Sequence, residues 1–203
     1  MKTPFCAPKG RPREFCTEEA LAAALRVFWS KGYEGASLSD LTEAMGITRP
    51  SLYAAFGNKE ALFRKALDLY EREKLSYMRP ALEAPTARGV AERLLRGALE
   101  MQTGDVSEPK GCLRVISSVA CGVEAESIRD EVIARRKSSS DALIERFERA
   151  KAAGELPDDM SAEGLSAYLS ALLQGLSLQA GGGASREELT QLVETSLAVW
   201  PTR

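Results

Sequence analysis

The side chains whose types and spacing best suit binding to nucleic acid are Arg49, Ser51, Tyr53 and Lys59. A guanidinium presents paired donors to a guanine edge, whereas a tyrosine hydroxyl or a lysine ammonium suits phosphates. The first three of these residues lie near the start of an apolar-periodic segment that follows a turn at Gly46. Two short helices joined by such a turn form a helix-turn-helix, whose second helix enters the major groove of DNA. The spacing therefore predicts that this segment reads DNA.

Catalytic chemistry has less support in the residue types. The chain has no histidine, the commonest general base, and its four cysteines form no Cys-x-x-Cys pair. A cysteine-dependent enzyme would have to use Cys112 or Cys121 without an imidazole, so this class stays an alternative. A regulator that senses electrophiles or oxidants through Cys112 or Cys16 is a second alternative. We expect no catalytic residue, no metal site and no cofactor.

Helices must position these side chains, because apolar residues recur at three- and four-residue spacing and no segment alternates as a strand does. The fold class is therefore predicted to be all-α. Capping signals place helix starts at Thr17, after Ser37 with its capping box to Asp40, after Thr48 and after Asn58. The first helix should stop at Gly32, and the one after Asn58 should run to about Met78. Further helices are expected at about 88–102, 111–122, 125–153, 161–180 and 186–199.

The N-terminal segment differs in character from the rest. Residues 1–16 contain three prolines together with Arg11 and Arg13, which predicts a flexible basic arm. Residues 1–65 carry 10 Lys and Arg against 7 Asp and Glu, whereas residues 66–203 carry 17 against 22. A basic end on an acidic body is typical of a DNA-binding module joined to another domain.

Several motifs in residues 13–64 together carry a family resemblance. In chain order they are Phe28-Trp29-Ser30-Lys31-Gly32-Tyr33, Ser37-Leu38-Ser39-Asp40-Leu41, Met45-Gly46-Ile47, and the run from Ser51 to Leu62 that contains Tyr53, Phe56 and Lys59. This stretch resembles the N-terminal domain of the TetR/AcrR family of repressors. The resemblance implies DNA contacts at Ser37, Thr48, Arg49, Ser51, Tyr53 and Lys59.

Two positions depart from the family pattern. Thr42 stands where a small alanine is usual, which predicts a slight adjustment of helix packing. Ala54 and Ala55 replace a larger polar pair, so fewer side chains remain to read bases. We therefore expect Arg11 and Arg13 of the arm to enter a minor groove and to contribute to binding. The alternative for the arm is a solvated tail.

For the C-terminal part, the residue pattern and the family resemblance together indicate a dimer interface and a ligand pocket. Small residues at four-residue spacing in 161–180, and the apolar face of 186–199, would form a four-helix dimer interface. The residues predicted for dimerisation are Ala167, Ala171, Leu172, Gly175, Leu189, Leu192, Val193 and Ser196. The alternative is that both stripes are ordinary core. The residues predicted to line a ligand pocket are Tyr70, Tyr77, Leu95, Leu99, Cys112, Ile116, Val119 and Tyr168.

These observations predict a ligand-responsive transcriptional repressor. Its expected partners are double-stranded operator DNA, a small-molecule effector and a second copy of itself, without a membrane. Residues 17–62 would form the DNA-binding domain, and residues 63–203 the effector-binding and dimerisation domain. We expect a cytoplasmic location, because we find no leader and no apolar run near the ~18 residues that span a bilayer. The acidic pI of about 5.5 argues against a nonspecific architectural DNA-binding protein.

Overall fold

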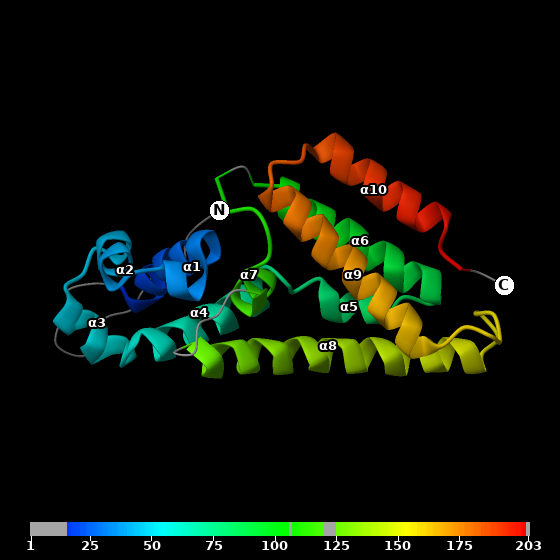
Figure 1. The fold of residues 1–203 in the computed structure, drawn as a ribbon, viewed down its shortest axis with the longest axis horizontal. Coiled ribbons are helices and arrows are strands. Elements are labelled where there is room, and N and C mark those ends of the chain that lie inside the picture. Colours follow the sequence, from blue (N-terminus) through cyan, green and yellow to red (C-terminus); the bar gives the residue numbers. More distant parts are fainter. Residues whose placement is uncertain (1–15, 106, 120–124, 202–203) are drawn as a thin grey trace.

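The computed structural model describes residues 16–105, 107–119 and 125–201, and every regular element among them is a helix (Figure 1). In chain order the helices are α1 (Thr17–Gly35), α2 (Leu38–Met45), α3 (Arg49–Phe56), α4 (Lys59–Glu73), α5 (Met78–Leu82), α6 (Ala87–Thr103), α7 (Leu113–Val119), α8 (Glu126–Ala152), α9 (Ala162–Gly181) and α10 (Arg186–Ala198). The all-α prediction is confirmed. Within the described residues, no helix is both long and apolar enough to cross a membrane.

Local capping chemistry sets the starts of α2, α3 and α4 but not that of α1. Ser37 and Asp40 form the predicted capping box, and the side chains of Thr48 and Asn58 accept backbone N–H groups at the starts of α3 and α4. The N-cap of α1 is Cys16, so Thr17 is its first helical residue. At Gly32 the backbone leaves helical geometry with φ 72°, and helical turns resume as far as Gly35. Gly32 is thus a break within α1 and not its last residue.

The helix that starts after Asn58 is shorter than predicted. α4 ends at Glu73 instead of near Met78, so its 15 residues span only ~22 Å. The backbone N–H of Leu75 turns back to the carbonyl of Tyr70, and the Leu75 side chain is buried. The helix ends with this burial of Leu75, and no glycine or proline in the sequence marks the position. A separate helix α5 then holds Pro80 in its first turn, where the missing N–H costs little.

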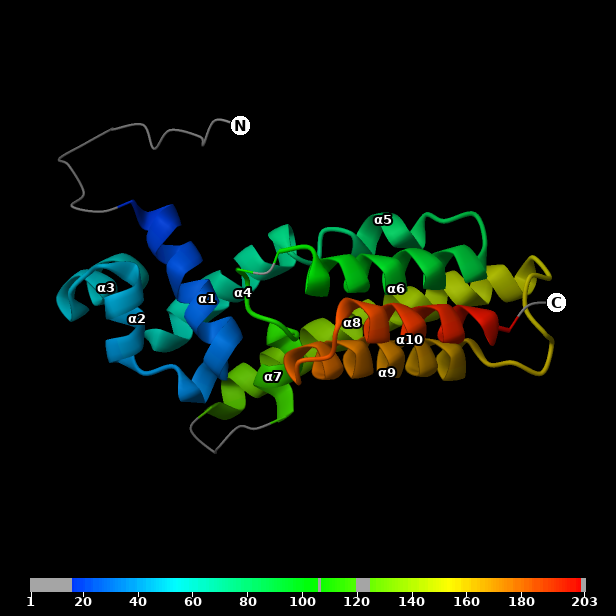
Figure 2. The same ribbon diagram turned by 90° about the horizontal axis from the view of Figure 1, so that it is seen from above.

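Figures 1 and 2 show two groups of helices at opposite ends of the elongated molecule, with α8 running along both. Each group encloses its own apolar core. One core joins α1–α4 with Leu113 of α7 and with Ile128 and Val132 of α8. The other joins α5, α6, α9 and α10 with Leu143 and Phe147 farther along α8. α4 crosses the expected domain boundary between residues 62 and 63. The two ends therefore share continuous helices.

Candidate DNA-binding surface and ligand cavity

The α2–α3 pair has the geometry of a helix-turn-helix. Leu41 and Leu52 are fully buried between the helices, and Gly46 makes the turn with φ 64°, a conformation that favours glycine. Arg49 is left exposed on the outer side of α3, and Tyr53 is 47% exposed. The burial of one face fixes the angle of α3, and the opposite face remains available to DNA.

The polar side chains at the start of α3 are already ordered by one another. The guanidinium of Arg49 donates to the Ser39 hydroxyl at 2.8 Å, and the hydroxyls of Thr48 and Ser51 lie 3.0 Å apart. Ser39 was not among the predicted site residues. It lies ten positions before Arg49, and only the packing of α2 on α3 brings the two together. Binding to a base would require Arg49 to exchange this neutral contact for a new one.

Ser37 and Lys59 occupy the edges of the same surface. The Ser37 hydroxyl donates to Asp40 at 2.7 Å, and Lys31 pairs with the same carboxylate at 2.7 Å. Hydrogen bonds from Lys31 and Ser37 hold the pKa of Asp40 well below its usual range. Lys59 starts α4, with its ammonium 4.5 Å from the centre of the Tyr33 ring.

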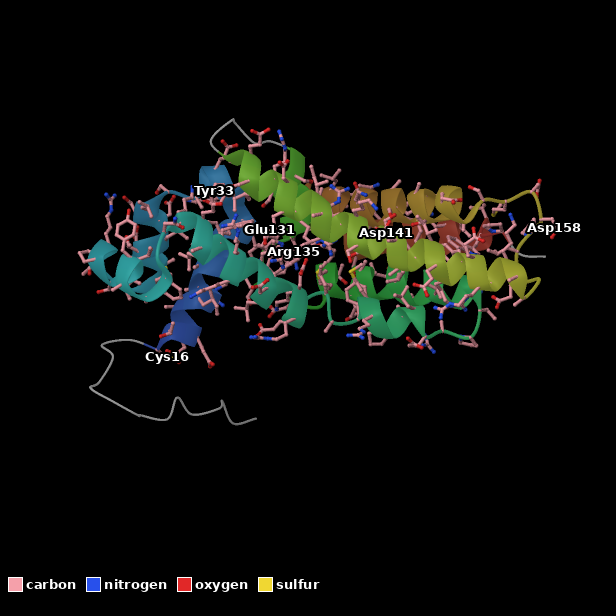
Figure 3. The ribbon with its side chains drawn as sticks, turned by 90° about the horizontal axis from the view of Figure 1, so that it is seen from below. Cys16, Tyr33, Glu131, Arg135, Asp141 and Asp158 are labelled. Carbon is pink, nitrogen blue, oxygen red and sulfur yellow. The ribbon has the colours of Figure 1, made fainter. Side chains whose placement is uncertain are left out.

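The position of Lys59 suits a phosphate contact. Burial lowers the pKa of Lys59, and the nearby Glu34 carboxylate opposes that shift. The free backbone N–H groups at the start of α4 also attract anions, as a helix N-terminus generally does. They therefore add to the attraction of the Lys59 ammonium for a phosphate. The ring of Tyr33, which is labelled in Figure 3, contacts this ammonium at the start of α4.

The remaining predictions for this region fall into two groups. Arg11 and Arg13 lie outside the described residues. The Thr42 hydroxyl turns back to donate to the Leu38 carbonyl at 2.9 Å. The adjustment of helix packing expected at this position stays a prediction.

A cavity of about 100 Å³ lies between α5, α6, α7, α8 and α9. The residues that line it are Leu75, Tyr77, Met78, Ala98, Met101, Cys112, Arg114, Val115, Arg136, Ser139, Ser140, Leu143, Ser170, Leu173, Gln174 and Ser177. Of the predicted ligand residues, the cavity brings together Tyr77 and Cys112. Burial raises the pKa of Tyr77, and the Cys112 side chain adds to that shift.

The other predicted ligand residues lie elsewhere. Tyr70 is buried just behind the cavity, with its hydroxyl 3.8 Å from the Met101 sulfur. Leu95 and Leu99 belong to the core of the α6 end. Tyr168 is on the outside of α9 against Trp200, with ring centres 6.2 Å apart.

The last two predicted ligand residues belong to α7. Ile116 packs against the core of the α1 end and beside Gly32. The side chain of Val119 is outside the described set. Contact of any of these residues with a ligand stays a prediction.

Two arginines give this cavity a character that sequence reasoning missed. The Arg114 side chain is only 9% exposed, and its guanidinium donates to Ser139 at 3.1 Å. Arg136 also lines the cavity and donates to the Ser118 hydroxyl at 2.8 Å. Arg114 follows Cys112 closely in the sequence, but its apolar surroundings come from other helices. No local pattern distinguishes it from a surface arginine.

The wall of the cavity at α7 is tied directly to α1. The Gly111 carbonyl, next to Cys112, accepts from the indole N–H of Trp29 at 2.8 Å and from the amide of Gln102 at 3.1 Å. Gly111 has φ 88°, which favours glycine, and its own N–H donates to Gln102 at 2.8 Å. Trp29 in turn packs edge-on against Tyr70 of α4. The segment that leads into α7 therefore contacts α1 directly and is connected to α4 through Trp29.

Ion pairs join α4 to α8, and they are centred on Glu131 and Arg135 of α8 (Figure 3). Glu131 of α8 accepts from Arg64 of α4 and from Arg135, the latter at 2.7 Å. Arg135 also reaches back to α4, to Asp68 at 2.7 Å and Glu71 at 2.9 Å. These carboxylates raise the pKa of Arg135 against the opposing effect of its burial.

Comparisons with known proteins identify the family. Residues 20–66 match the model of the bacterial regulatory proteins of the tetR family. Over 196 residues the chain is 33% identical to the HTH-type transcriptional repressor ComR of Escherichia coli K12, covering 95% of this chain and 92% of ComR. The chain belongs to the TetR family. It is a transcriptional regulator of the helix-turn-helix type, and α2 and α3 are that motif.

Two further TetR-family relatives extend the comparison. The HTH-type transcriptional repressor BdcR of Escherichia coli K12 is 28% identical over 89% of this chain and 86% of its own length. A solved structure of the regulator CifR is 44% identical, with a TM-score of 0.87 over 94% of this chain and 100% of that chain. That structure is a cysteine variant complexed with 26-base-pair double-strand operator DNA.

The TetR-family dimer prediction rests on α9 and α10, and the two helices present their residues differently. On α9, Ala167 and Ala171 are exposed, Leu172 and Gly175 are half-buried, and the neighbouring Leu178 is 60% exposed. On α10, the predicted residues turn toward the subunit's own core: Leu189, Val193 and Ser196 are buried, and Leu192 is half-buried against it. Their part in a dimer contact stays a prediction, whereas α9 leaves an uncovered apolar face.

Proposed function

We propose that this protein is a repressor that binds a pseudo-palindromic operator as a homodimer and leaves it when a small molecule fills the α5–α9 cavity. The observation that carries the proposal is the double contact made by α7 and the two residues before it: Cys112 and Arg114 line the cavity, while Gly111 is hydrogen-bonded to Trp29 of α1. A ligand that favours one position of α7 would move the helices that hold α2 and α3. Repressor names among the relatives support the direction of control.

The division of labour follows the chain. Residues 17–62 bind DNA and residues 63–203 bind the effector and the second subunit, with α4 as the helix shared by both. Such a regulator has no catalytic step, so we propose no enzymatic activity. It acts in the cytoplasm, where bacterial operators are.

The homodimer supplies two recognition helices for the two half-sites, about 34 Å or a little more apart. The exposed apolar face of α9 favours this helix as the contact, because small residues permit close approach of a partner helix. Ala171→Glu should convert the dimer to a monomer, measured by sedimentation or light scattering, and abolish operator binding. Ala134→Glu, on an exposed position of α8, is the matched control and should remain dimeric. A dimeric Ala171→Glu protein would contradict this interface.

Release of DNA on ligand binding would follow from thermodynamic linkage. A ligand that weakens DNA binding must itself bind less tightly to the operator-bound protein, by the same factor. An effector that releases DNA yet binds free and operator-bound protein equally would overturn the proposed coupling.

A gel-shift assay with labelled DNA from the gene's own upstream region tests the proposal. Sequence-specific retention in the presence of competitor DNA supports a specific regulator, whereas retention lost to any competitor indicates a nonspecific binder. Ala98→Leu fills part of the cavity, so a compound that releases the parent protein should fail to release this variant. If the compound released the variant from DNA at the same concentration as it releases the parent protein, the effector would bind elsewhere.

Thiol sensing through Cys112 is a second candidate, favoured by its place in the cavity wall. Mass spectrometry after a mild oxidant or an aldehyde, paired with the gel-shift assay on Cys112→Ser, tests it. Cys16 at the start of α1 is outside the set of cavity-lining residues and serves as the comparison through Cys16→Ser (Figure 3). If both variants release operator as readily as the parent under these reagents, the effector is a reversible ligand.

A further inference from the structure

We propose that the α5–α9 cavity selects a small amphipathic anion, of the carboxylate class, with its acid group between Arg114 and Arg136. The inference rests on the proposed function of this cavity as the effector site. It names the chemistry of the ligand, which the fold by itself leaves open.

The lining of the cavity is both apolar and polar. Apolar side chains come mainly from the α5 and α6 side, and also from α7, α8 and α9: Leu75, Met78, Ala98, Met101, Val115, Leu143 and Leu173. Polar side chains come from α7, α8 and α9 and include Arg114, Arg136, Ser139, Ser140 and Gln174. A ligand with a hydrocarbon body and one polar end matches this mixed lining.

Arg114 is the side chain that favours an anionic ligand. Its side chain is 9% exposed, and its Nε has no hydrogen-bond partner within the described part of the chain. One terminal nitrogen donates to the neutral hydroxyl of Ser139 at 3.1 Å. The other lies 3.7 Å from Glu71, beyond hydrogen-bond distance. A buried cation with an unused donor costs free energy, and an acceptor placed in the cavity would remove that cost.

The charge of Arg114 is only partly balanced by its surroundings. The Glu71 carboxylate is shared between two arginines: Oε2 lies 2.9 Å from Arg135 and Oε1 lies 3.7 Å from Arg114, so one negative charge faces two guanidinium groups. Arg136 adds a second guanidinium, and its hydrogen bond at 2.8 Å goes to the neutral hydroxyl of Ser118. Among the described residues, no carboxylate lies within ion-pair distance of Arg136. The polar end of the cavity therefore carries net positive charge.

This charge discriminates between ligands of one shape. A carboxylate can accept from two guanidinium groups at once, and such charge-assisted bonds are about twice as strong as neutral ones. A neutral amide would satisfy fewer of these donors, and an ammonium group would be repelled. Tyr77 reinforces the preference, because burial raises the pKa of its phenol and keeps it a neutral donor beside the cavity.

Calorimetric titration of the full-length protein tests the inference. The probes are butanoate, hexanoate, octanoate and benzoate, each compared with its primary amide and with the matched alkyl- or benzylammonium. We expect at least one carboxylate to bind about 10- to 100-fold more tightly than its amide, because a charged hydrogen bond contributes more than a neutral one. The ammonium compounds should not bind. Equal affinity of acid and amide, or no binding by any carboxylate, would overturn the inference.

Variants locate the anion. Arg114→Gln should reduce the preference for acid over amide to less than about 3-fold, because acid binding loses charge-assisted bonds whereas amide binding loses at most a weaker bond to a neutral acceptor. Arg72→Gln, an exposed arginine of α4 outside the cavity, is the matched control and should keep the preference. Arg114→Lys retains the charge, so it should bind the acid more tightly than Arg114→Gln does. It also provides the comparison if the glutamine variant does not fold. Unchanged preference in both Arg114 variants would contradict the inference.

Ala98→Leu separates the two proposals. If amides bind as tightly as acids and Ala98→Leu blocks both, the cavity is the effector site and the anion inference is wrong. If acids release operator equally well from Ala98→Leu and parent, the proposed effector site is itself wrong. Acid binding that is blocked by Ala98→Leu and weakened by Arg114→Gln supports both.

Discussion

The side chains expected to touch DNA are held differently before DNA arrives. Arg49 is bonded to a neutral hydroxyl of Ser39, which it can exchange for a base, whereas Lys59 lies against the Tyr33 ring at the start of α4. The first arrangement suits a group that reads sequence, and the second a group that holds a phosphate.

Arg49→Ala and Lys59→Ala should therefore fail in different ways. Arg49→Ala should lose about 1–3 kcal/mol of discrimination at one base pair of each half-site and relax the preference there. Lys59→Ala should weaken all sequences alike and reduce the salt slope by about one. Fluorescence anisotropy with the operator and single-base variants, at several salt concentrations, measures both. Arg79→Ala, on α5, is the control; unchanged base preference in Arg49→Ala would show that α3 is not the reader.

Gly97 is a position where adding a single methyl group should change the cavity wall. A Cβ built there would lie 2.3 Å from the Tyr77 ring, so Gly97→Ala must displace that ring from the cavity wall. We expect a loss of about 1–3 kcal/mol in the free energy of unfolding, typical of overpacking, and altered binding of cavity ligands. Gly35→Ala is the control, because its Cβ would meet Lys31 at an ordinary 3.5 Å. Urea unfolding compares them; a Gly97→Ala protein as stable as the parent would show that Tyr77 moves freely.

At the scale of elements, α8 is the common support of both ends of the molecule. Its first turns pack with the core of α1–α4, and later turns pack with the core of α6, α9 and α10. The cavity lies where these cores meet, against the short helix α7. Helix contacts of this kind favour a few discrete arrangements over continuous deformation, because packed interfaces are dense.

The α4–α8 ion pairs should stabilise this arrangement measurably. Glu131→Gln leaves Arg64 without its α8 carboxylate and weakens Arg135, so we expect a loss of about 1 kcal/mol, discounted for partial exposure, and reduced coupling between effector and operator. Asp141→Asn is the control, because Asp141 (Figure 3) forms an exposed ion pair with Lys137 of the same helix. Denaturant unfolding at low and high salt measures the difference. Equal effects of the two substitutions would show that the interhelical pairs contribute nothing special.

For the whole molecule, the absence of histidine determines the response to pH. Hydrogen bonds and ion pairs lower the pKa of Asp40, of Glu60 and of Glu131 in the folded state. A carboxyl whose pKa is lowered on folding stabilises the fold above its unfolded value, and this contribution disappears as pH falls through the folded value. No side chain type in the sequence has an ordinary pKa near 6.5.

We therefore expect the free energy of unfolding to be nearly flat between about pH 6 and 8 and to fall below about pH 4.5. Operator affinity should be flat over the same neutral range. Urea unfolding and anisotropy across a pH series check both. A transition centred near pH 6.5 would require a titrating group that the folded structure does not explain.

The amino-acid sequence by itself determined the helix starts at the DNA-binding end and the family. Ser37, Thr48 and Asn58 cap their helices through bonds to residues three positions away, so a local pattern carries the information. The end of α4 was predicted wrongly because no glycine or proline marks it, and the burial of Leu75 that ends it is a tertiary event. Similarly, a helical stripe on α10 indicated an apolar face but not which partner covers it.

Only the tertiary structure decided the cavity and its charge. Arg114 is adjacent to Ser139 from 25 positions away, and Arg64 meets Glu131 from 67 positions away. The free energy of burying a guanidinium depends on the helices around it, which neighbouring residues in the chain do not specify. The capping side chains could be assigned from sequence because their partners are local, whereas the cavity arginines could not because their environment is assembled from five helices.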